Sequence, residues 1–562
     1  AYNVFAISLL NVLNGNFDWK GGNSVGGSHW HEMGGKVAGQ VSLKSVPGGN
    51  SPSGVPISRH GVDYEKDAPN LHARDGYPAK RPWFPFVKYW NYQEILPSIK
   101  DEYPYGVDVL IMYWNDMLYS TPAARDVGEA VMADEKKIPH IIAFDILIGE
   151  TSKWADYILP DTTWLERWST PHVAPAILTK ASGFRQPLVG TFSEEVIGGA
   201  TRKFYVSPFS RGNVAQDYWL GTQDATGPQL LEDILIALGG RLGIPGVGPG
   251  AFDISQAASG YDWRGDLYSA WDWYLNVLNN FSVETGGQVT VDEILAKGGL
   301  FEPLTGSPND PNVAYDGDYL AHAYKGILHL YIEDLATTRD SMTGETFDPL
   351  PRYAPVRDLL DNPVEPPPGF DFHLVTYRRV YHAQGRTICN PWLQGIEPEG
   401  FVELNTADGE RLGIRTGDYV RVESPDGVII AGRARLTEGM RPGVVGAPHS
   451  YGHWEMGSND ANTINGNAVP FDKARSKGVL LNHVMKLDPV LGDVTLQDKV
   501  GGAASFYDSP VRVSKASGPL KGGVVWLSRA GQSTSQSALD AIRARLRARQ
   551  KTIRSRSSRL WD

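Results

Sequence analysis

The sequence has 562 residues, of which 41% are hydrophobic and 21% are charged, and its formal net charge is −11. One hydrophobic core does not serve so long a chain, so we expect several lobes. The acidic balance argues against a nucleic-acid-binding surface over the whole chain, and no stretch approaches the roughly 20 apolar residues that cross a bilayer. The single cysteine, Cys389, excludes an internal disulfide framework and an iron–sulfur cluster ligated wholly by this chain.

The opening stretch, AYNVFAISLLNVL, predicts a buried helix, because apolar side chains cover most of its surface. A glycine-rich run follows, in which His29 and His31 flank a tryptophan. An HxH pair can ligate a metal, but no third ligand lies nearby in the sequence, so we favour a loop packed by hydrogen bonds and predict no metal site. Residues 40–90 are rich in Pro, Gly and Ser and predict a long ordered excursion over a larger body.

Two apolar runs follow, VDVLIMYWND (107–116) and IPHIIAFDILIGET (138–151), and the stretch between them, TPAARDVGEAVMADEKK, has helical character. Strand, helix and strand at this spacing predict a βαβ unit with two parallel strands in a sheet covered on both faces. Ligands bind beyond the carboxyl ends of such strands. The polar residues that end these two runs are therefore candidates for a ligand site.

Asn115 and Asp116 end the first predicted strand, and Asp145, Glu150 and Thr151 end the second. Carboxylates there can accept hydrogen bonds from a guanine edge or a ribose, while Asn115 and Thr151 can hold a phosphate or sugar oxygen. The GxGxxG fingerprint is absent, which disfavours an ordinary nicotinamide dinucleotide site. Simple capping of the strands explains the same residues, and the spacing alone leaves both interpretations open.

The pattern D(x4)ET(x3)ADYILPDTTxLER, which starts at Asp145, closely resembles molybdopterin oxidoreductases of the dimethyl sulfoxide reductase superfamily. In that family an acid–threonine pair and an AD-x-x-LP turn line a site for bis-molybdopterin guanine dinucleotide. The resemblance therefore implies that Asp145, Glu150, Thr151 and Asp156 contact this cofactor. Pro160 ends an extended piece that begins at Tyr157, because proline cannot donate to a strand ladder.

Residues 368–515 form a second block. HLVTY and FVELN predict short strands, Thr406 can cap the helical turn TADGERLGI, and GDYVRVESPDGVIIAGRARL alternates and turns at SPDG. Val420 and Val422 are predicted to face one side of their strand. Several such strands imply a small barrel, and the resemblance implies the family's C-terminal double-psi barrel, which closes over the pterin cofactors.

Within this block, TYRRVYHAQGRTICNPWL resembles the family segment that contacts the pterin phosphates, and the later stretches PHSYGHWEMGSNDANTINGN and LLNHVMKLDPVLGDVTLQDKVGG resemble its closing loops. Guanidinium groups suit pyrophosphate oxygens, and amides suit a pterin edge. The resemblance thus adds a second set of expected cofactor contacts: Arg378, Gln384, Arg386, Thr387, Asn390, His453 and Asn482. Structural roles are expected for Arg379, His449, His483 and Cys389.

The fold class expected from these patterns is α/β and multi-lobed, with a parallel-sheet, dinucleotide-binding-like βαβ domain and a C-terminal double-psi β-barrel. The expected divisions are an end of the catalytic half with a loop excursion (1–100), the βαβ domain (101–200), a loop-rich and helical return (201–367), the barrel (368–515) and a basic tail (516–562). The tail is expected either to dock an acidic partner or an anionic membrane surface, or to be a solvated extension.

LLNVLNGNFDWKGGN resembles the family segment that follows the catalytic half, so the chain is expected to be the C-terminal portion of a larger catalytic subunit, which would not turn over substrate by itself. The molybdenum ligand and a [4Fe-4S] cluster are expected in that other half. The motif combination is nearest to tetrathionate reductase catalytic subunits, which implies reduction of a sulfur oxyanion in anaerobic respiration. Thiosulfate, polysulfide, arsenate and selenate reductases are alternatives.

Family resemblance further implies two partners, a membrane anchor subunit together with an iron–sulfur electron-transfer subunit. It also implies a small anionic substrate, no nucleic acid, and a place in the periplasm or on the outer face of the cytoplasmic membrane. Two rival hypotheses remain: a non-catalytic scaffold homologue in an electron-transfer complex, and a plain nucleotide-binding module that uses residues 106–160. The cofactor-type residues Asn115, Thr151 and Arg386 argue against a scaffold. The second matching block at 376–390 argues against a simple module.

Overall fold

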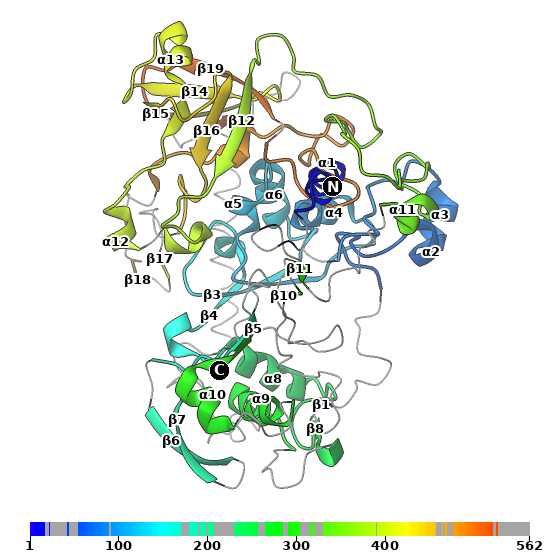
Figure 1. Cartoon of the computed structure of the whole chain (residues 1–562), viewed down its shortest axis with the longest axis vertical. Helices are drawn as coiled ribbons and strands as arrows, with labels where there is room; N and C mark the ends of the chain where they lie inside the picture. The colour runs from blue at the N-terminus through cyan, green and yellow to red at the C-terminus, as the bar shows by residue number, and fades with distance from the viewer. Residues whose placement is uncertain are drawn as a thin grey trace. The chain divides into compact units, whose positions relative to one another are not determined.

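The structure is a computed structural model (Figure 1). It describes residues 1–16, 19, 22, 42–43, 54–88, 91–169, 179–188, 191–197, 200–206, 230–256, 265–284, 290–303, 315–316, 319–320, 330–388, 390–456, 463–464, 467–468, 476–507, 509–520 and 524–526. The predictions for His29, His31, Cys389 and most of the basic tail lie outside these residues.

The chain divides into two compact units. The first comprises Ala1–Asn3, Gly54–Ile158 and Tyr331–Asp562, and the second comprises Val4–Ser53 and Leu159–Leu330. The first unit contains both the βαβ unit and the barrel. The division into five stretches that the sequence suggests stays a prediction.

The predicted βαβ unit is confirmed. Strand β2 (Val109–Tyr113) leads through the helices α5 (Met117–Ser120) and α6 (Arg125–Met132) to strand β3 (His140–Asp145). The two strands pair in parallel, with Val109 opposite His140. Beyond β3, the short helix η2 (Ser152–Trp154) leads into β4 (Tyr157–Pro160), and the sheet order is β2-β3-β4.

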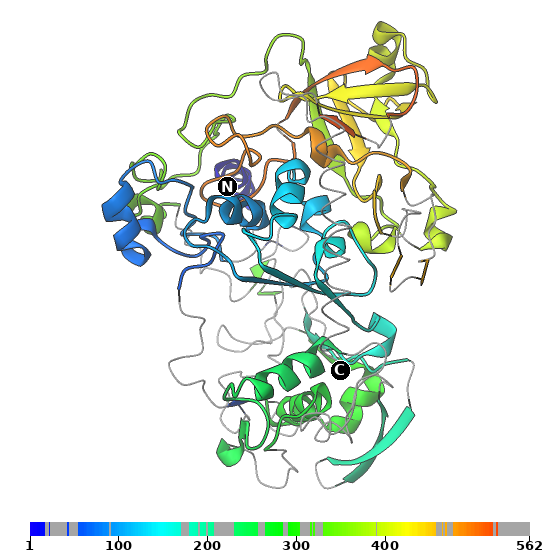
Figure 2. The same cartoon turned by 180° about the vertical axis from the view of Figure 1, so that it is seen from behind.

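Figures 1 and 2 both show α5 and α6 beside the sheet, together with α4 (Ile95–Asp101). Buried Met112, Ile141 and Ala143 of the strands pack in one cluster with side chains of these helices. The prediction of a sheet covered on both faces is wrong for β2. Val109, Ile111 and Tyr113 are 48%, 51% and 41% exposed, because in the described part of the chain the helices cover one face of this strand only.

The C-terminal block forms a closed barrel. Its strands are β12 (Phe372–Tyr377), β13 (Val402–Leu404), β14 (Tyr419–Glu423), β15 (Val428–Leu436), β16 (Val444–Pro448) and β19 (Pro510–Lys515), and β20 (Val524–Trp526) adds to β15. The order is β13-β16-β12-β19-β14-β15, and pairing of β13 with β15 closes the ring. The pairs β12–β16 and β13–β15 are parallel, and the other neighbours are antiparallel. The predicted barrel is confirmed, and its double-psi topology stays a prediction.

The alternation in the sequence explains the barrel interior. Val420 and Val422 are both fully buried in the barrel core, as predicted, and the turn after them closes when Gly427 N donates to Ser424 O at 3.1 Å. The helix α13 (Thr406–Leu412) is also present, but its cap was misplaced by one residue. Asn405, not Thr406, accepts from Ala407 N at 2.9 Å, because the cap residue must itself keep an extended backbone.

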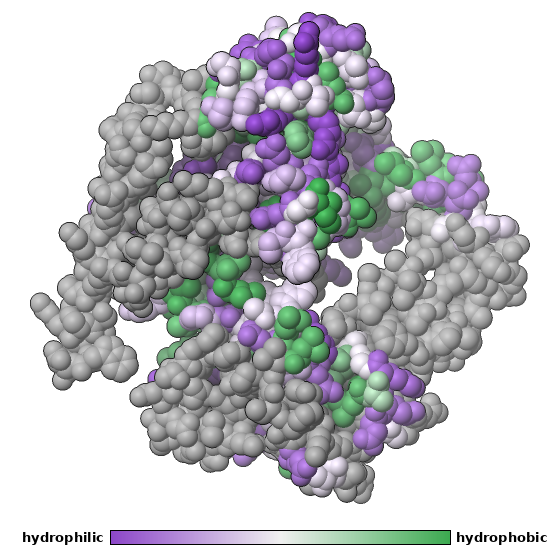
Figure 3. All heavy atoms as spheres, turned by 90° about the vertical axis from the view of Figure 1, so that its left-hand side faces the viewer, coloured by the Kyte–Doolittle hydropathy of each residue, from purple (hydrophilic) through white to green (hydrophobic). Residues whose placement is uncertain are grey.

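Shorter elements complete the first unit. They are α2 (Tyr64–Asp67), α3 (Pro69–Asp75), η1 (Tyr92–Glu94), α11 (Glu333–Thr337), η6 (Gln384–Thr387), α12 (Pro391–Gln394), β17 (Thr463–Ile464), β18 (Asn467–Ala468) and η8 (Leu481–Val484). Figure 3 shows that the described surface over the barrel, at the top of the view, is mainly hydrophilic.

A buried ionic cluster fastens residues 54–101 to the C-terminal part of the first unit. The carboxylate of Glu94, fully buried, pairs with Arg59 and with Arg81, whose Nε lies 2.8 Å away. Gln497 Nε2 donates to Glu94 Oε1 at 2.6 Å, and Arg81 Nη2 bonds Asp493 Oδ1 at 3.0 Å. The predicted excursion is thus held by charges that lie far apart in the sequence.

The second unit has its own core. Its elements are β1 (Ser42–Leu43), η3 (Trp164–Glu166), β5 (Thr179–Gly183), β6 (Thr191–Ile197), β7 (Ala200–Val206), α8 (Leu231–Arg241), β8 (Phe252–Asp253), η5 (Ile254–Gln256), α9 (Ala270–Glu284), α10 (Val291–Lys297), β9 (Gly299–Pro303), β10 (Tyr315–Asp316) and β11 (Tyr319–Leu320). Trp168, Phe184, Trp271 and Leu278 pack at its centre. The helices α8 and α9 lie within the stretch 201–367, for which the sequence predicts helices and loops.

The first helix, α1 (Tyr2–Leu13), is present, but the prediction that it is buried is wrong. None of its residues is buried, and Val4, Ile7, Leu10 and Leu13 are between 59% and 71% exposed. Their spacing places them on one stripe of the helix. A search of the described residues for helices long and apolar enough to cross a membrane finds none.

Candidate functional site

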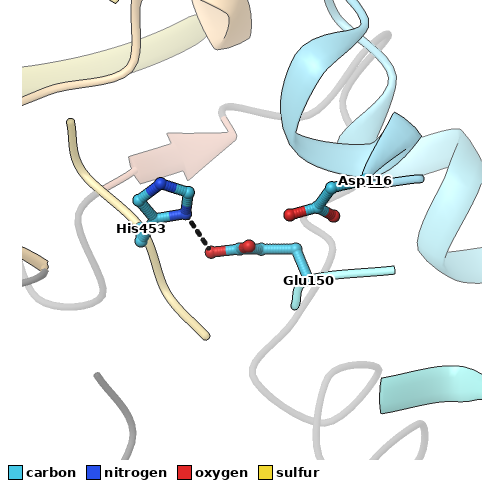
Figure 4. A group of neighbouring side chains, drawn as sticks. All are labelled: Asp116, Glu150 and His453. Carbon is cyan, nitrogen blue, oxygen red and sulfur yellow. Dashed lines mark hydrogen bonds and ion pairs between the residues drawn. The ribbon is translucent and has the colours of Figure 1, made fainter. Parts of the chain in front are cut away.

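Three ionisable side chains meet beyond the carboxyl ends of β2 and β3. Asp116 follows β2, Glu150 follows β3, and His453 comes from the segment 449–456 that leaves the barrel strand β16. One ligand-type atom from each lies within 4.8 Å of the others (Figure 4). A parallel sheet thus presents polar groups where such sheets bind ligands, as predicted from the sequence.

Glu150 fastens the C-terminal segment to the βαβ unit. Its side chain is fully buried, and its Oε1 atom accepts hydrogen bonds from His453 Nδ1 at 2.9 Å, Trp454 N at 2.9 Å and Glu455 N at 3.0 Å. Burial alone would raise the pKa of this carboxyl, but His453 and the hydrogen bonds hold the pKa well below its usual range. Glu150 is therefore a buried anion that three donors compensate.

Asp116 joins the ends of the two strands. Its Oδ1 atom accepts from Thr151 N at 2.9 Å and from Thr151 Oγ1 at 2.7 Å, while Leu118 N donates to the same hydroxyl at 3.0 Å. Burial and then the neighbouring Glu150 raise the pKa of Asp116 well above its usual value. The two carboxyl groups therefore have opposite pKa shifts, a pattern typical of functional sites.

His453 lies flat against Tyr119 of α5, with ring centroids 3.9 Å apart and planes 9° from parallel. The Tyr119 hydroxyl donates to Tyr451 O at 2.9 Å. From the other closing loop, Asn482 Nδ2 donates to Tyr119 O at 3.1 Å and to Ser120 O at 2.9 Å. Both predicted closing-loop residues, His453 and Asn482, thus reach the βαβ unit.

Strained backbone borders this site. Trp114, Ser450 and Met456 have φ angles of 46°, 78° and 55°, in the left-handed region that residues with a side chain seldom adopt. The first directly follows β2, and the other two flank the segment that carries His453. Such strain persists where the surrounding contacts determine the conformation, and it clusters at binding sites.

A second polar group lies at the carboxyl ends of the parallel barrel strands β12 and β16. Arg378 is exposed there, and no acid among the described residues pairs with it. His449 N donates to Tyr377 O at 3.0 Å, and no described residue bonds its buried Nε2 atom. Burial and then the charge of Arg378 lower the pKa of His449.

These two residues fit a phosphate group, because an imidazole N–H and a guanidinium that no described acid pairs with can both donate to its oxygens. Arg379, by contrast, pairs with Glu397 at 2.8 Å and Glu403 at 2.6 Å, so its predicted structural role is confirmed. The donor set at this end of the barrel suits a pyrophosphate such as that of a pterin dinucleotide.

Five of the remaining predicted contacts accept a hydrogen bond from a backbone N–H of the protein. Asn115 Oδ1 accepts from Met117 N at 2.9 Å, Asp145 Oδ1 from Ile146 N at 2.9 Å, Asp156 Oδ2 from Ile141 N at 2.8 Å, Thr387 Oγ1 from Ala383 N at 2.9 Å, and Asn390 Oδ1 from Trp392 N at 2.9 Å. Gln384 begins η6 with a φ of 58°, and the side chain of Arg386 lies outside the described structure. Their part in cofactor binding stays a prediction.

Three residues of these sites were not among the predicted contacts. Asp116 was placed at a strand end by the sequence, but only its approach to Glu150 reveals its altered pKa. Nothing in the sequence around Tyr119 indicated a role at the site, because its ring stacks on His453, which lies 334 residues further along the chain. His449 was assigned a structural role. Its position directly after β16, which pairs in parallel with β12, could have indicated a ligand contact, because ligands bind at the carboxyl ends of parallel strands.

Comparisons with known proteins agree with this geometry. Residues 372–492 match the family described as the molydopterin dinucleotide binding domain. This match covers the barrel strands β12 to β16 and both closing-loop residues. The chain belongs to the molybdopterin oxidoreductases of the dimethyl sulfoxide reductase family.

Curated relatives extend over most of the chain. A selenate reductase subunit of Mesobacillus selenatarsenatis is 33% identical over 92% of this chain and 50% of its own length. A tetrathionate reductase subunit of Salmonella typhimurium is 28% identical over 92% of this chain and 50% of its own length, and that of Archaeoglobus fulgidus is 28% identical over 81% and 42%. The chain spans about half the length of the curated relatives it matches.

Proposed function

We propose that this chain is the cofactor-closing portion of a molybdenum-dependent oxidoreductase that binds bis-molybdopterin guanine dinucleotide. One observation carries the proposal. The barrel that matches the dinucleotide-binding family is fastened by Glu150 and Asn482 to the carboxyl ends of β2 and β3, where a parallel sheet binds ligands. When bound, the cofactor supplies two-electron redox chemistry at molybdenum.

The residues of this chain bind and orient that group. Arg378 and His449 are proposed to donate to its phosphate oxygens at the end of the barrel. The strand-end residues Asn115, Asp145 and Thr151 are proposed to meet the dinucleotide at the sheet. Glu150 and His453 hold the closing segment in place, which excludes water from the region between them.

The substrate is proposed to be a small oxyanion. The sequence motifs are nearest to tetrathionate reductases, and the relatives reported above include both a selenate reductase and tetrathionate reductases. Reduction of such an anion in anaerobic respiration is part of the proposal. A thiosulfate, polysulfide or arsenate substrate is the alternative within the same superfamily.

The complete enzyme is proposed to carry a [4Fe-4S] cluster and the molybdenum ligand in a portion that this chain does not contain, and to work with a membrane anchor and an iron–sulfur subunit. Its proposed location is the periplasm or the outer face of the cytoplasmic membrane. A scaffold without catalysis is the second candidate, since most of the strand-end residues also have structural partners inside the protein.

The first test is the composition of the protein purified from its source. We expect a species larger than this chain that contains molybdenum, guanine dinucleotide and iron. It should oxidise a reduced viologen dye with selenate or tetrathionate faster than with arsenate or thiosulfate. A metal-free species of this chain's own mass would leave the scaffold as the better description.

A pair of neighbouring arginines tests the phosphate assignment. Arg378→Ala is expected to lower the guanine dinucleotide recovered per chain roughly tenfold or more, since a charge-assisted bond to phosphate contributes about 1.5–3 kcal/mol. Its thermal unfolding should match the wild type. Arg379→Ala is the matched control: it should lower the melting temperature, because Glu397 and Glu403 lose their partner. Equal cofactor content in Arg378→Ala and wild type would remove Arg378 from the site.

A further inference from the structure

The two carboxyl groups at the strand ends face one another (Figure 4). In each, one oxygen is fully engaged: Glu150 Oε1 accepts three hydrogen bonds and Asp116 Oδ1 accepts two. The other oxygens, Oε2 of Glu150 and Oδ2 of Asp116, are buried, and no donor among the described residues bonds them. The backbone itself makes room for this approach, because a Cβ on Gly149 would lie only 3.0 Å from Asp116 Oδ2.

One oxygen of each carboxyl group lies within 4.8 Å of the other. Two buried carboxylates so close together do not both ionise unless a positive charge lies between them. The positive charge can be a proton that the two carboxyl groups share. It can also be a metal ion, since Asp, Glu and His are all metal ligands. The hydrogen bonds decide between the two. His453 Nδ1 and Glu150 Oε1 already bond each other at 2.9 Å, so a metal ion bound through either of these two atoms would have to break that bond. The proton requires no rearrangement of these contacts.

The charges around the pair are already balanced. Arg125, His453 and His483 interact electrostatically with Glu150, and Glu455 donates its backbone N–H to it. Glu129 and Lys153 are the ion-pair partners of Arg125 and Glu455. Arg125 lies over the Trp454 ring at 3.9 Å and 3.3 Å from Glu129, and Lys153 pairs with Glu455 at 2.9 Å. His483 is neutral, because burial and then Arg125 lower its pKa well below the usual value. One ionised carboxylate at Glu150 suits these surroundings, whereas a second would have no cation of its own among the residues that the structure describes.

We propose that Asp116 is a neutral acid at physiological pH, that it donates its proton to Glu150 Oε2, and that this shared proton, not a metal ion, positions His453 over the strand ends. Asp116 is thus a positioning residue that acts through Glu150. That the positioned segment closes a cofactor site rests on the proposed function. The shared proton itself rests only on the contacts above.

The proposal has a definite pH dependence. In the unfolded chain Asp116 loses its proton near pH ~3.9, whereas in the folded chain it keeps the proton to higher pH. Folding therefore takes up a proton in this interval, and the stability that Asp116 contributes is fully present below the unfolded pKa and falls as the pH rises toward the folded one. The equilibrium constant for folding should change by up to about tenfold per pH unit there.

Infrared spectroscopy of the purified chain tests for the proton directly. We expect the C=O stretch of a protonated carboxylic acid at pH 7 in the wild type, and we expect Asp116→Asn to lose it. Asp145→Asn, at the same edge of the sheet, is the matched control and should retain the band. A band that survives unchanged in Asp116→Asn would refute the proposal.

Two further measurements distinguish a shared proton from a bound metal ion, and the titration of Asp116 from a general loss of stability. The folding equilibrium of Asp116→Asn, whose amide donates at every pH, should lack the fall toward alkaline pH that the wild type shows. Calorimetry with Zn²⁺ or Mn²⁺ should show no tight site in the wild type. One tightly bound equivalent that Asp116→Asn fails to bind would overturn the proposal in favour of a metal site. None of these measurements depends on molybdenum. The shared-proton proposal can therefore hold even if the proposed function is wrong.

Discussion

Glu150→Ala is expected to release residues 451–456 from the βαβ unit. The substitution leaves His453 Nδ1, Trp454 N and Glu455 N without their shared acceptor in a buried place. An unsatisfied buried donor costs about 1–3 kcal/mol, so we expect a loss of roughly 3–5 kcal/mol in local stability. Hydrogen exchange followed by mass spectrometry measures it as faster exchange of this segment.

Two variants calibrate that result. Glu150→Gln keeps an acceptor oxygen but loses the charge, so it should lose a smaller part of the protection, since neutral hydrogen bonds are about half as strong. Glu423→Ala removes an acid whose partner Arg512 is largely exposed, and it should change little, by about 0.5 kcal/mol. Unaltered exchange of residues 451–456 in Glu150→Ala would contradict the role assigned to this carboxylate.

Glu94→Ala is the second substitution with a large expected effect. It leaves Arg59 and Arg81, which are 0% and 1% exposed, without the carboxylate between them, and Gln497 loses an acceptor. Breaking a buried ion pair by removing one partner costs about 3–5 kcal/mol. We expect a loss of that size in the unfolding free energy of the first unit, measured by chemical denaturation.

The same carboxylate gives a pH signature. Burial would raise the pKa of Glu94, but Arg81 and Arg59 hold it below the usual value. A depressed folded pKa means that the stability is present above the unfolded pKa, about 4.3, and is lost as the pH falls through the folded pKa. The difference between wild type and Glu94→Ala should therefore shrink in acid. Lys137→Ala, which removes an exposed pair with Glu102, should show neither effect.

Local pattern predicted the elements of the first unit well and their surroundings less well. The apolar runs at 107–116 and 138–151 became the parallel strands β2 and β3, because an apolar run indicates a strand and a helix between two strands makes them parallel. Coverage of a sheet face depends on where helices pack, so the exposed Val109 and Ile111 were not predictable. The same reason explains the exposed stripe of α1.

Residue roles at the site divide in the same way. Glu150 and Thr151 lie beyond the end of the second strand, as the sequence predicts, whereas the cofactor contacts that the resemblance implies for them and for His453 stay predictions. The sequence did not predict that Thr151 bonds Asp116, or that Glu150 accepts from three consecutive residues of a distant segment. Partners separated by 35 residues in the first case, and by 303 to 305 in the second, leave no periodicity in the sequence.

The sequence by itself determined the family, the order of strands and helices in the βαβ unit, and the alternation that forms the barrel, because these depend on residue type and spacing along the chain. Only the tertiary structure decided which polar groups are shared, buried or unpartnered. The approach of Asp116 to Glu150 sets their opposite pKa shifts, and that approach exists only because two strand ends and a loop from the barrel meet in a place with little water. Charge and proton placement follow distance and burial, which the fold alone supplies.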